Sequence, residues 1–212
     1  MKEINIENWN RKKHYEFFKN LDYPHFNVCA NIDITEFLKY TKSNGEPFFI
    51  STLFLVMKSI NSIKEFRYRM REETVVEHEV VHPSFTIMGD EDVFGFCYVD
   101  YSNDFLDFKT RAEISIEKAK MDISMEDEIG KDDMVFLTSM PWVSFTSISH
   151  PIQLKPADSF PRIAWGKFFM ESGRVKLPLS VQVHHALMDG MHVGHLFIKV
   201  QEVFDDVEVN LK

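Results

Sequence analysis

Two adjacent histidines and an aspartate four residues further on form the densest group of chemically active side chains in this sequence. His184 and His185 follow directly on the alternating run 180–183, and the turn signal Asp189-Gly190 comes next. An imidazole titrates near neutral pH, so a histidine at a strand end, where a core gives way to a cleft, can serve as a general base. The carboxyl group of Asp189 could fold back towards that base or pair with a cationic side chain elsewhere.

Two other interpretations of this segment stay open. The histidines can be ordinary strand-end residues, with Asp189-Gly190 only a turn or a helix cap. A metal site is the second alternative, with His185 and Asp189 as two of its ligands. His192 and His195, three residues apart on one helical face, could complete such a site. The sequence has no HExxH pattern, and we therefore expect no metal.

The elements that must position these residues are a mixture of strands and helices. Alternating or β-branched runs predict strands, and apolar residues at helical spacing predict helices. Strands are expected at 26–34, 67–71, 75–81, 84–88, 94–99, 134–138, 143–149, 163–169 and 175–184, with a hairpin turn at 171–173. Helices are expected after a cap near Asn8 and at 35–43, 48–66, 103–122 and 193–204. Because the two kinds do not alternate strictly, we expect an α+β fold or a two-layer α/β sandwich.

Composition and charge are those of a folded domain. The 212 residues are 44% hydrophobic and 27% charged, which is enough to bury a large core, and we expect one domain over 1–212. Twenty phenylalanines indicate a core or an interface lined with rings. The net charge of -9 argues against nucleic acid or an anionic membrane as the main partner, since phosphate binding favours a basic face.

Cysteine spacing and apolar runs exclude further classes of protein. Cys29 and Cys97 lie far apart without CxxC spacing, which argues against a disulfide framework and against a cysteine zinc site. The N-terminus lacks the apolar core of a signal peptide, and the longest apolar stretch, 48–57, is too short to cross a bilayer. We therefore expect a cytoplasmic protein with no membrane partner.

Three separated segments resemble the chloramphenicol acetyltransferase family. LPLSVQVHHALMDGMHVG (177–194) is similar to the block around the HHxxxDG signature, which dihydrolipoyl acyltransferases share in looser form. NWNRKKHY (8–15) resembles the family's W-x-R-K-x-H-aromatic start, and PWVSFTS (141–147) resembles its PWV-x-F-x-S segment. The segments occur in the family's order and span most of the chain.

The resemblance implies a fold, an assembly and a set of roles. Family members are α+β sandwiches with a mixed sheet and helices on one face, and they form homotrimers with active sites at the subunit interfaces. The base matches His185, its ring oriented by its own backbone carbonyl, and the donor to the developing oxyanion matches Ser147. Asp189 matches a residue that pairs with the N-terminal arginine, here Arg11, and that does not act as a triad carboxylate.

The resemblance also implies which residues meet the two substrates, acetyl-CoA and a hydroxyl acceptor. Phe17, Phe18 and Phe26 match aromatic positions of the antibiotic pocket. Ala164 stands where the family has a threonine that holds a water near the transition state.

The positions on the acetyl-CoA side depart from the family's residues. Pro47 replaces a lysine, and Phe49 and Phe168 stand at aromatic positions without the hydroxyl that is common there. On the acceptor side, the chain between Thr86 and Phe94 is one residue shorter than usual in the family. These changes bear on the identity of the acceptor and on efficiency, whereas the base, the oxyanion donor and the ion pair are intact.

The function predicted on these grounds is acetyl-CoA-dependent O-acetylation of chloramphenicol, by direct transfer and without an acyl-enzyme. Three alternatives stay open. The same fold could act on a different hydroxyl acceptor, the chain could be a lipoyl-type acyltransferase domain, or it could be a catalytically silent protein that binds a small aromatic ligand.

Overall fold

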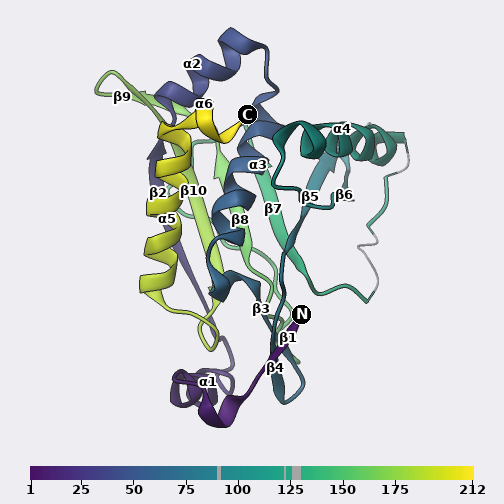
Figure 1. Cartoon of the computed structure of the whole chain (residues 1–212), viewed down its shortest axis with the longest axis vertical. Helices are drawn as coiled ribbons and strands as arrows, with labels where there is room; N and C mark the ends of the chain where they lie inside the picture. Colours follow the sequence, from purple (N-terminus) through teal and green to yellow (C-terminus); the bar gives the residue numbers. More distant parts are fainter. Residues whose placement is uncertain (90–91, 122, 126–129) are drawn as a thin grey trace.

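The computed structural model describes residues 1–89, 92–121, 123–125 and 130–212. Its large sheet follows the strand path β2-β10-β8-β7-β5-β6, with β9 paired to β10, and a small sheet has the order β1-β4-β3 (Figure 1). The strands are β1 Lys2–Ile4, β2 His25–Asp33, β3 Tyr68–Arg71, β4 Thr74–Glu77, β5 His82–Met88, β6 Phe94–Tyr98, β7 Met134–Met140, β8 Arg162–Gly166, β9 Phe169–Glu171 and β10 Arg174–His184. The pairs β5–β7 and β7–β8 are parallel and the other described pairs are antiparallel, so the sheet is mixed.

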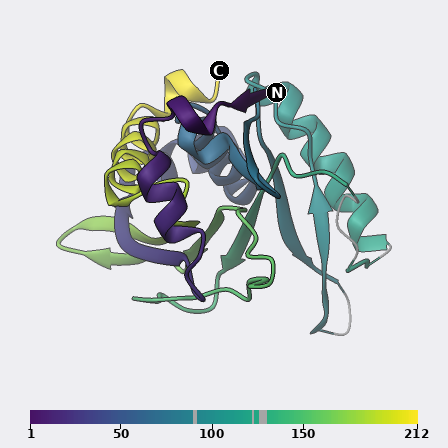
Figure 2. The same ribbon diagram turned by 90° about the horizontal axis from the view of Figure 1, so that it is seen from below.

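The helices cover one face of the large sheet. They are α1 Lys12–Phe18, α2 Thr35–Asn44, α3 Phe48–Asn61, α4 Phe105–Met121, α5 Gly190–Asp205 and α6 Val207–Asn210, with 3-10 turns η1 Ile6–Asn8 and η2 Lys64–Arg67. Figure 2 shows α3, α4 and α5 on one side of the sheet and the green segment 141–161 on the other. The predicted α+β class, with a mixed sheet and helices on one face, is confirmed.

The side chains of β10 separate these two faces. Val181 and Val183 are 0% exposed and belong to the same apolar core as Leu53 of α3. Gln182 and His184 point to the opposite side, because successive residues of a strand alternate between faces. These polar side chains are buried too, so the second face of the sheet is polar and covered without being an apolar core.

Two predicted helix boundaries are wrong. The first helix begins at Lys12, because Asn8 ends the 3-10 turn η1 and the side chain of Asn5 caps that turn. The helix predicted over 48–66 ends at Asn61, where the backbone tightens into bonds between residues three apart. The side chain of Asn61 contributes to this ending, since its amide donates to the carbonyl of Val81 at 2.9 Å outside the helix.

Three predicted strands also differ from the structure. The strand predicted over 75–81 ends at Glu77, and the one predicted over 163–169 is divided into β8 and β9. Residues 143–149 form no strand, although Val143 and Phe145 favour one. Instead of joining a ladder, the backbone carbonyl of Ile148 accepts a hydrogen bond from a side chain, that of Asn27.

Parts of two predictions fall outside the described residues. They are Asp122 at the end of the predicted helix 103–122, and residues 90 and 91 of the shortened 86–94 segment. Within the described ranges, no helix combines the length and the apolar character that a bilayer crossing requires.

Candidate active site

His185 lies where the chain leaves the large sheet. Strand β10 ends at His184, and the N–H of His185 donates to the carbonyl of Pro24 at 2.8 Å, which continues the β2–β10 pairing by one residue. The side chain of His185 is partly exposed, whereas that of His184 is 0% exposed. The two adjacent histidines therefore lie in different environments.

Two phenylalanines hold the ring of His185. Phe18 of α1 stacks on it with ring centroids 3.8 Å apart and planes inclined by 7°. Phe26 of β2 packs at 4.6 Å with an inclination of 46°. A ring with aromatic neighbours this close cannot turn without losing those contacts. The plane of the imidazole is therefore fixed by α1 and β2 together.

The hydrogen bond at Nδ1 determines which ring nitrogen can act as a base. Nδ1 of His185 lies 3.1 Å from the carbonyl oxygen of Met188. A carbonyl oxygen can only accept, so Nδ1 carries the proton and Nε2 carries the lone pair. No hydrogen bond from the described residues reaches Nε2. The Nδ1–H group thus donates to the carbonyl of Met188, whereas the carbonyl of His185 itself, which was expected to orient the ring, accepts from Arg11.

Arg11 joins the N-terminal segment to the loop after β10. This guanidinium is 9% exposed and donates to three acceptors: Asp189 Oδ2 at 2.7 Å, the His185 carbonyl at 2.9 Å and the Ala186 carbonyl at 3.1 Å. The ion pair expected between Arg11 and Asp189 is thus present. The loop keeps its shape because one planar cation satisfies two of its carbonyls and its carboxylate.

The carboxyl group of Asp189 also begins helix α5. It accepts from the backbone N–H of Met191 at 3.2 Å, as an N-cap does. Burial raises its pKa, but the hydrogen bond from Arg11 and the nearby His192 outweigh this and hold the pKa below its usual value. Asp189 is therefore ionised at neutral pH, and it serves the cap and the ion pair.

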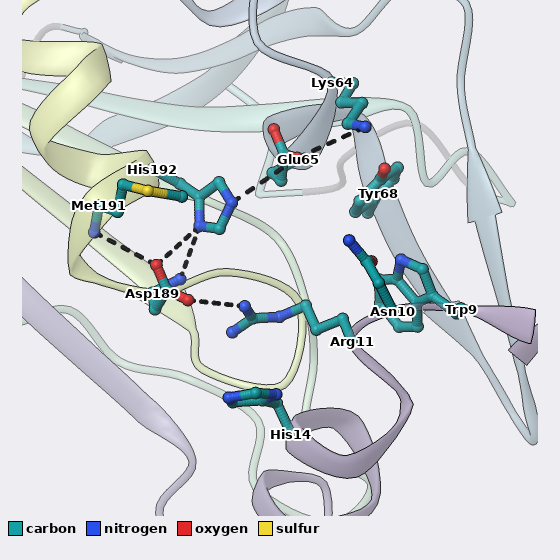
Figure 3. A pocket seen from close by; sticks show the side chains of 10 residues that line it. All are labelled: Trp9, Asn10, Arg11, His14, Lys64, Glu65, Tyr68, Asp189, Met191 and His192. Atoms are coloured by element: carbon teal, nitrogen blue, oxygen red, sulfur yellow. Dashed lines mark hydrogen bonds and ion pairs between the residues drawn. The ribbon is translucent and has the colours of Figure 1, made fainter.

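A pocket of about 230 Å³ adjoins the Arg11–Asp189 pair (Figure 3). The backbone N–H of Asp189 donates to Nδ1 of His192 at 3.1 Å, and Nε2 of His192 lies 3.6 Å from a carboxylate oxygen of Glu65. The described lining residues, which do not include His185, are Trp9, Asn10, Arg11, His14, Lys64, Glu65, Tyr68, Asp189, Met191 and His192. His192 thus extends the ion pair into a polar network. Among the described residues, no three or more His, Cys, Asp or Glu side chains are grouped so that they could hold a metal ion.

His184 has the properties of a structural histidine. Its Nδ1 accepts from the N–H of Ala186 at 3.2 Å, and its ring contacts that of His25 with centroids 4.9 Å apart. Burial lowers the pKa of His184 to about 3, so the ring is neutral at physiological pH. It supports the turn that carries His185 and does not reach solvent.

Ser147 lies in the irregular, exposed segment 141–150, and no described contact joins it to His185. The segment lies against the polar face of the sheet, where Asn27 donates to the Ile148 carbonyl. Phe26, the preceding residue of β2, contacts His185. Since neighbouring strand residues point to opposite faces, Ser147 and His185 belong to opposite sides of β2. Within one chain, the structure does not bring these two residues together.

The residues expected to meet the acceptor lie in different surroundings. Phe17 is 64% exposed and contacts the edge of Phe18 at 5.1 Å, so it extends the ring cluster of His185 to the surface. Ala164 is fully buried on β8, between Thr138 of β7 and Ser180 of β10. Only the phenylalanines therefore gather at the histidine.

The two residues expected on the acetyl-CoA side are also apart from His185. Phe49 packs against Phe85 and Trp165 at 5.4 and 5.7 Å. Phe168, between β8 and β9, is 41% exposed and lies 5.7 Å from the ring of Phe48. Of this pair, Phe168 is the one available at the surface.

Several contacts of the site could not be predicted from the sequence. The Met188 carbonyl that orients His185 leaves no trace in residue type. Asn27 and Gln182 are visible in the sequence as polar residues within apolar strands. Their pairing in the β2–β10 ladder, however, depends on a register that the sequence does not state.

Comparisons with known proteins agree with this architecture. The family model described as Chloramphenicol acetyltransferase matches residues 1–201. A chloramphenicol acetyltransferase of Klebsiella sp is 30% identical over 206 residues, which cover 96% of this chain and 93% of the relative. Chloramphenicol acetyltransferase 3 of Escherichia coli is 28% identical over 95% of both chains.

Solved structures show the same relationship. A chloramphenicol acetyltransferase structure superposes with a TM-score of 0.86 at 26% identity, over 96% of this chain and 100% of the other. The dihydrolipoamide acetyltransferase of Azotobacter vinelandii shares the fold, with a TM-score of 0.70 at 17% identity over 94% and 88% of the two chains. The predicted resemblance is confirmed: this chain belongs to the chloramphenicol acetyltransferase family.

Proposed function

We propose that this protein transfers the acetyl group of acetyl-CoA directly to a hydroxyl of chloramphenicol, with His185 as the general base. The observation that carries the proposal is the fixed imidazole: its ring is held by Phe18 and Phe26, and its Nδ1–H is bound to the Met188 carbonyl. The lone pair of Nε2 is thereby presented at the end of β10. The relatives of this protein named above, which match it over nearly the whole chain, are chloramphenicol acetyltransferases.

The reaction balances with one histidine. Nε2 of His185 takes the proton of the acceptor hydroxyl while that oxygen attacks the thioester carbonyl, forming the new C–O bond and a tetrahedral intermediate. When the intermediate collapses, the C–S bond breaks and the imidazolium returns its proton to the leaving sulfur. The products are the acetyl ester and CoA with a free thiol. The Met188 carbonyl stabilises the imidazolium in the meantime, because it continues to accept from Nδ1–H.

Ser147 is the proposed donor to the negatively charged oxygen of the intermediate. Since Ser147 and His185 lie on opposite sides of β2, we propose that each active site combines His185 of one copy with Ser147 of another, in a homotrimer. Strand β2 is an edge of the sheet path, and Trp142 and Val143 beside the serine are 66% and 52% exposed. An exposed apolar surface of this kind supports association between copies.

The two substrates are assigned to the ring-lined surfaces around these residues. Phe17, Phe18 and Phe26 are the proposed acceptor contacts, since Phe18 and Phe26 contact the ring of His185 and Phe17 contacts Phe18. Phe168 is a proposed contact of acetyl-CoA because of its exposure. For Phe49 and Ala164, which pack against neighbouring side chains and strands, the contribution proposed is to the shape of the site.

The decisive experiment is a thiol-release assay with acetyl-CoA and chloramphenicol. His185→Ala should lower kcat by about 10²–10⁴-fold, as expected for loss of a general base. His195→Ala, an exposed histidine on α5, is the matched control and should leave the rate unchanged. If CoA thiol is released with another alcohol and not with chloramphenicol, that alcohol replaces chloramphenicol as the proposed acceptor. Chloramphenicol binding that survives His185→Ala, without turnover of any alcohol, would instead indicate a silent binding protein.

A further inference from the structure

The segment that carries Ser147 lacks regular structure, yet its serine needs a defined position. An oxyanion donor acts only when it lies close to the place where the charge develops, and a displacement of about 1 Å can cost roughly 10²-fold in rate. Residues 141–150 contain neither helix nor strand, and Ser147 is exposed. The position of Ser147 must therefore come from side chains that hold its neighbours.

On the N-terminal side, the segment is tied to the end of β8. The N–H of Lys167 donates to the Val143 carbonyl at 2.8 Å, and the hydroxyl of Ser144 donates to the Lys167 carbonyl at 2.6 Å. These two bonds fix residues three and four positions before Ser147. They leave the side that follows Ser147 unconstrained.

On the C-terminal side, two amide side chains of the sheet hold the segment. Nδ2 of Asn27 donates to the Ile148 carbonyl at 2.9 Å, one residue after the serine. Oε1 of Gln182 accepts from the N–H of His150 at 3.0 Å. Asn27 and Gln182 face each other in the β2–β10 ladder, so the two amides lie side by side on the same face of the sheet.

The orientation of the Asn27 amide is itself determined. The hydroxyl of Ser180 donates to Oδ1 of Asn27 at 2.8 Å. If the amide were turned over, its oxygen would face the Ile148 carbonyl, and two acceptors would meet. The Ile148 carbonyl, which can only accept, therefore decides that the N–H₂ group of Asn27 faces the backbone next to Ser147, and the Ser180 hydroxyl holds the oxygen at the other end of the amide.

We propose that Asn27 is a positioning residue for the oxyanion donor, and that it acts through the Ile148 carbonyl to fix Ser147, with Ser180 holding the oxygen of its amide. This inference rests on the proposed function, because it assigns Asn27 a role only through Ser147. Through Ser147, Asn27 affects the stability of the tetrahedral intermediate and not the binding of the substrates. Its loss should lower kcat and leave both KM values nearly unchanged.

A double-mutant cycle tests the proposal. Asn27→Ala should lower kcat about 10-fold, and Ser147→Ala about 10²-fold. The double variant should be no slower than Ser147→Ala alone, because a residue that acts through the serine has nothing left to position. Asn27→Asp, which keeps the shape but lacks the N–H₂ donor, should be as slow as Asn27→Ala. Asn31→Ala, an exposed position of the same strand, is the control and should match the parent enzyme.

Each result is decisive. Unchanged kcat in Asn27→Ala, or effects that multiply in the double variant, would overturn the positioning role. Unchanged kcat in Ser147→Ala would instead refute the proposed oxyanion donor. If Asn27→Ala lowers the melting temperature strongly, Ser180→Ala replaces it in the cycle, since it leaves the asparagine in place and removes only the hydrogen bond that holds its Oδ1. Ser180→Ala should lower kcat less than Asn27→Ala does. The proposal is supported if this loss vanishes in the Ser147→Ala background and contradicted if it persists there.

Discussion

The loop 185–190 and the segment 141–150 carry the two proposed catalytic groups, but different kinds of contact hold them. The loop is held by a buried guanidinium, an ionised carboxylate, one stacked ring and one tilted ring. The segment is held by neutral amides and a hydroxyl. Bonds to charged groups contribute about 1.5–3 kcal/mol each and neutral ones about 0.5–1.5 kcal/mol. His185, the proposed base, is thus held by stronger contacts than the segment that carries Ser147.

The largest effect expected from this difference follows loss of the guanidinium. Arg11→Ala leaves the Asp189 carboxylate and two carbonyls without their partner, and should lower the free energy of unfolding by about 3–5 kcal/mol. Asn27→Ala should lower it less, by about 1–3 kcal/mol, because two neutral hydrogen bonds are lost. Urea unfolding of both variants measures this contrast.

A surface arginine supplies the control. Arg111 pairs with Asp107 on α4, where both side chains are more than 40% exposed. Arg111→Ala should change the free energy of unfolding by less than about 1 kcal/mol. Equal losses in Arg11→Ala and Asn27→Ala would mean that the two regions are held equally, contrary to the comparison.

A smaller effect, which depends on pH, comes from the histidine under the loop. Burial lowers the pKa of His184 to about 3, below its ordinary value of 6.5. Between these two values the unfolded chain binds a proton that the folded chain does not. The stability therefore falls as the pH is lowered below 6.5, by up to about 1.4 kcal/mol per unit from this group.

Replacement of His184 should flatten that dependence. Asn at position 184 can still accept from the N–H of Ala186 but does not titrate. His150, whose pKa is also lowered by burial, is only half-buried, so His150→Asn should flatten the dependence less. Urea unfolding at pH 5, 6, 7 and 8 measures the slopes. Parallel curves for His184→Asn and the parent protein would refute the neutral, buried state of this ring.

The smallest expected effect is a difference between Phe18, which contacts the ring of His185, and its neighbour Phe17, which does not. Phe18→Ala removes the stack on His185 and should cost about 1 kcal/mol of stability and roughly 10-fold in kcat. Phe17→Ala should leave kcat unchanged and raise only the KM for the acceptor, because Phe17 touches Phe18 and not the imidazole. Steady-state kinetics of both variants test the distinction, and a shared loss of kcat would contradict it.

The parts of the molecule that sequence patterns predicted are those determined by local spacing. The alternation of 175–184 predicted β10, and the Asn44-Gly45 pair predicted the end of α2, where Gly45 has φ +70°. The resemblance to the family predicted that Arg11 and Asp189 pair across nearly the full chain. Nothing in local propensity could have done so, because the two residues are 178 positions apart.

The parts that were missed depend on backbone groups and on register. The strand predicted over 143–149 is wrong: the carbonyl of Ile148 bonds to the side chain of Asn27 and that of Val143 to the N–H of Lys167, contacts that no local pattern reports. The carbonyl of His185 itself was expected to orient the ring, whereas the structure has Nδ1 3.1 Å from the carbonyl oxygen of Met188. A backbone acceptor has no side-chain signature, so only the folded geometry identifies it.

The carboxylate of Asp189 is shared between the start of α5 and the guanidinium of Arg11. Asp189 and Arg11 lie 178 positions apart in the sequence, so no local stretch of chain can form this loop alone. Without the guanidinium, the carboxylate lacks its counter-ion and two carbonyls of the loop lack their donor. The surroundings of His185 are thus completed only when two segments far apart in the sequence come together.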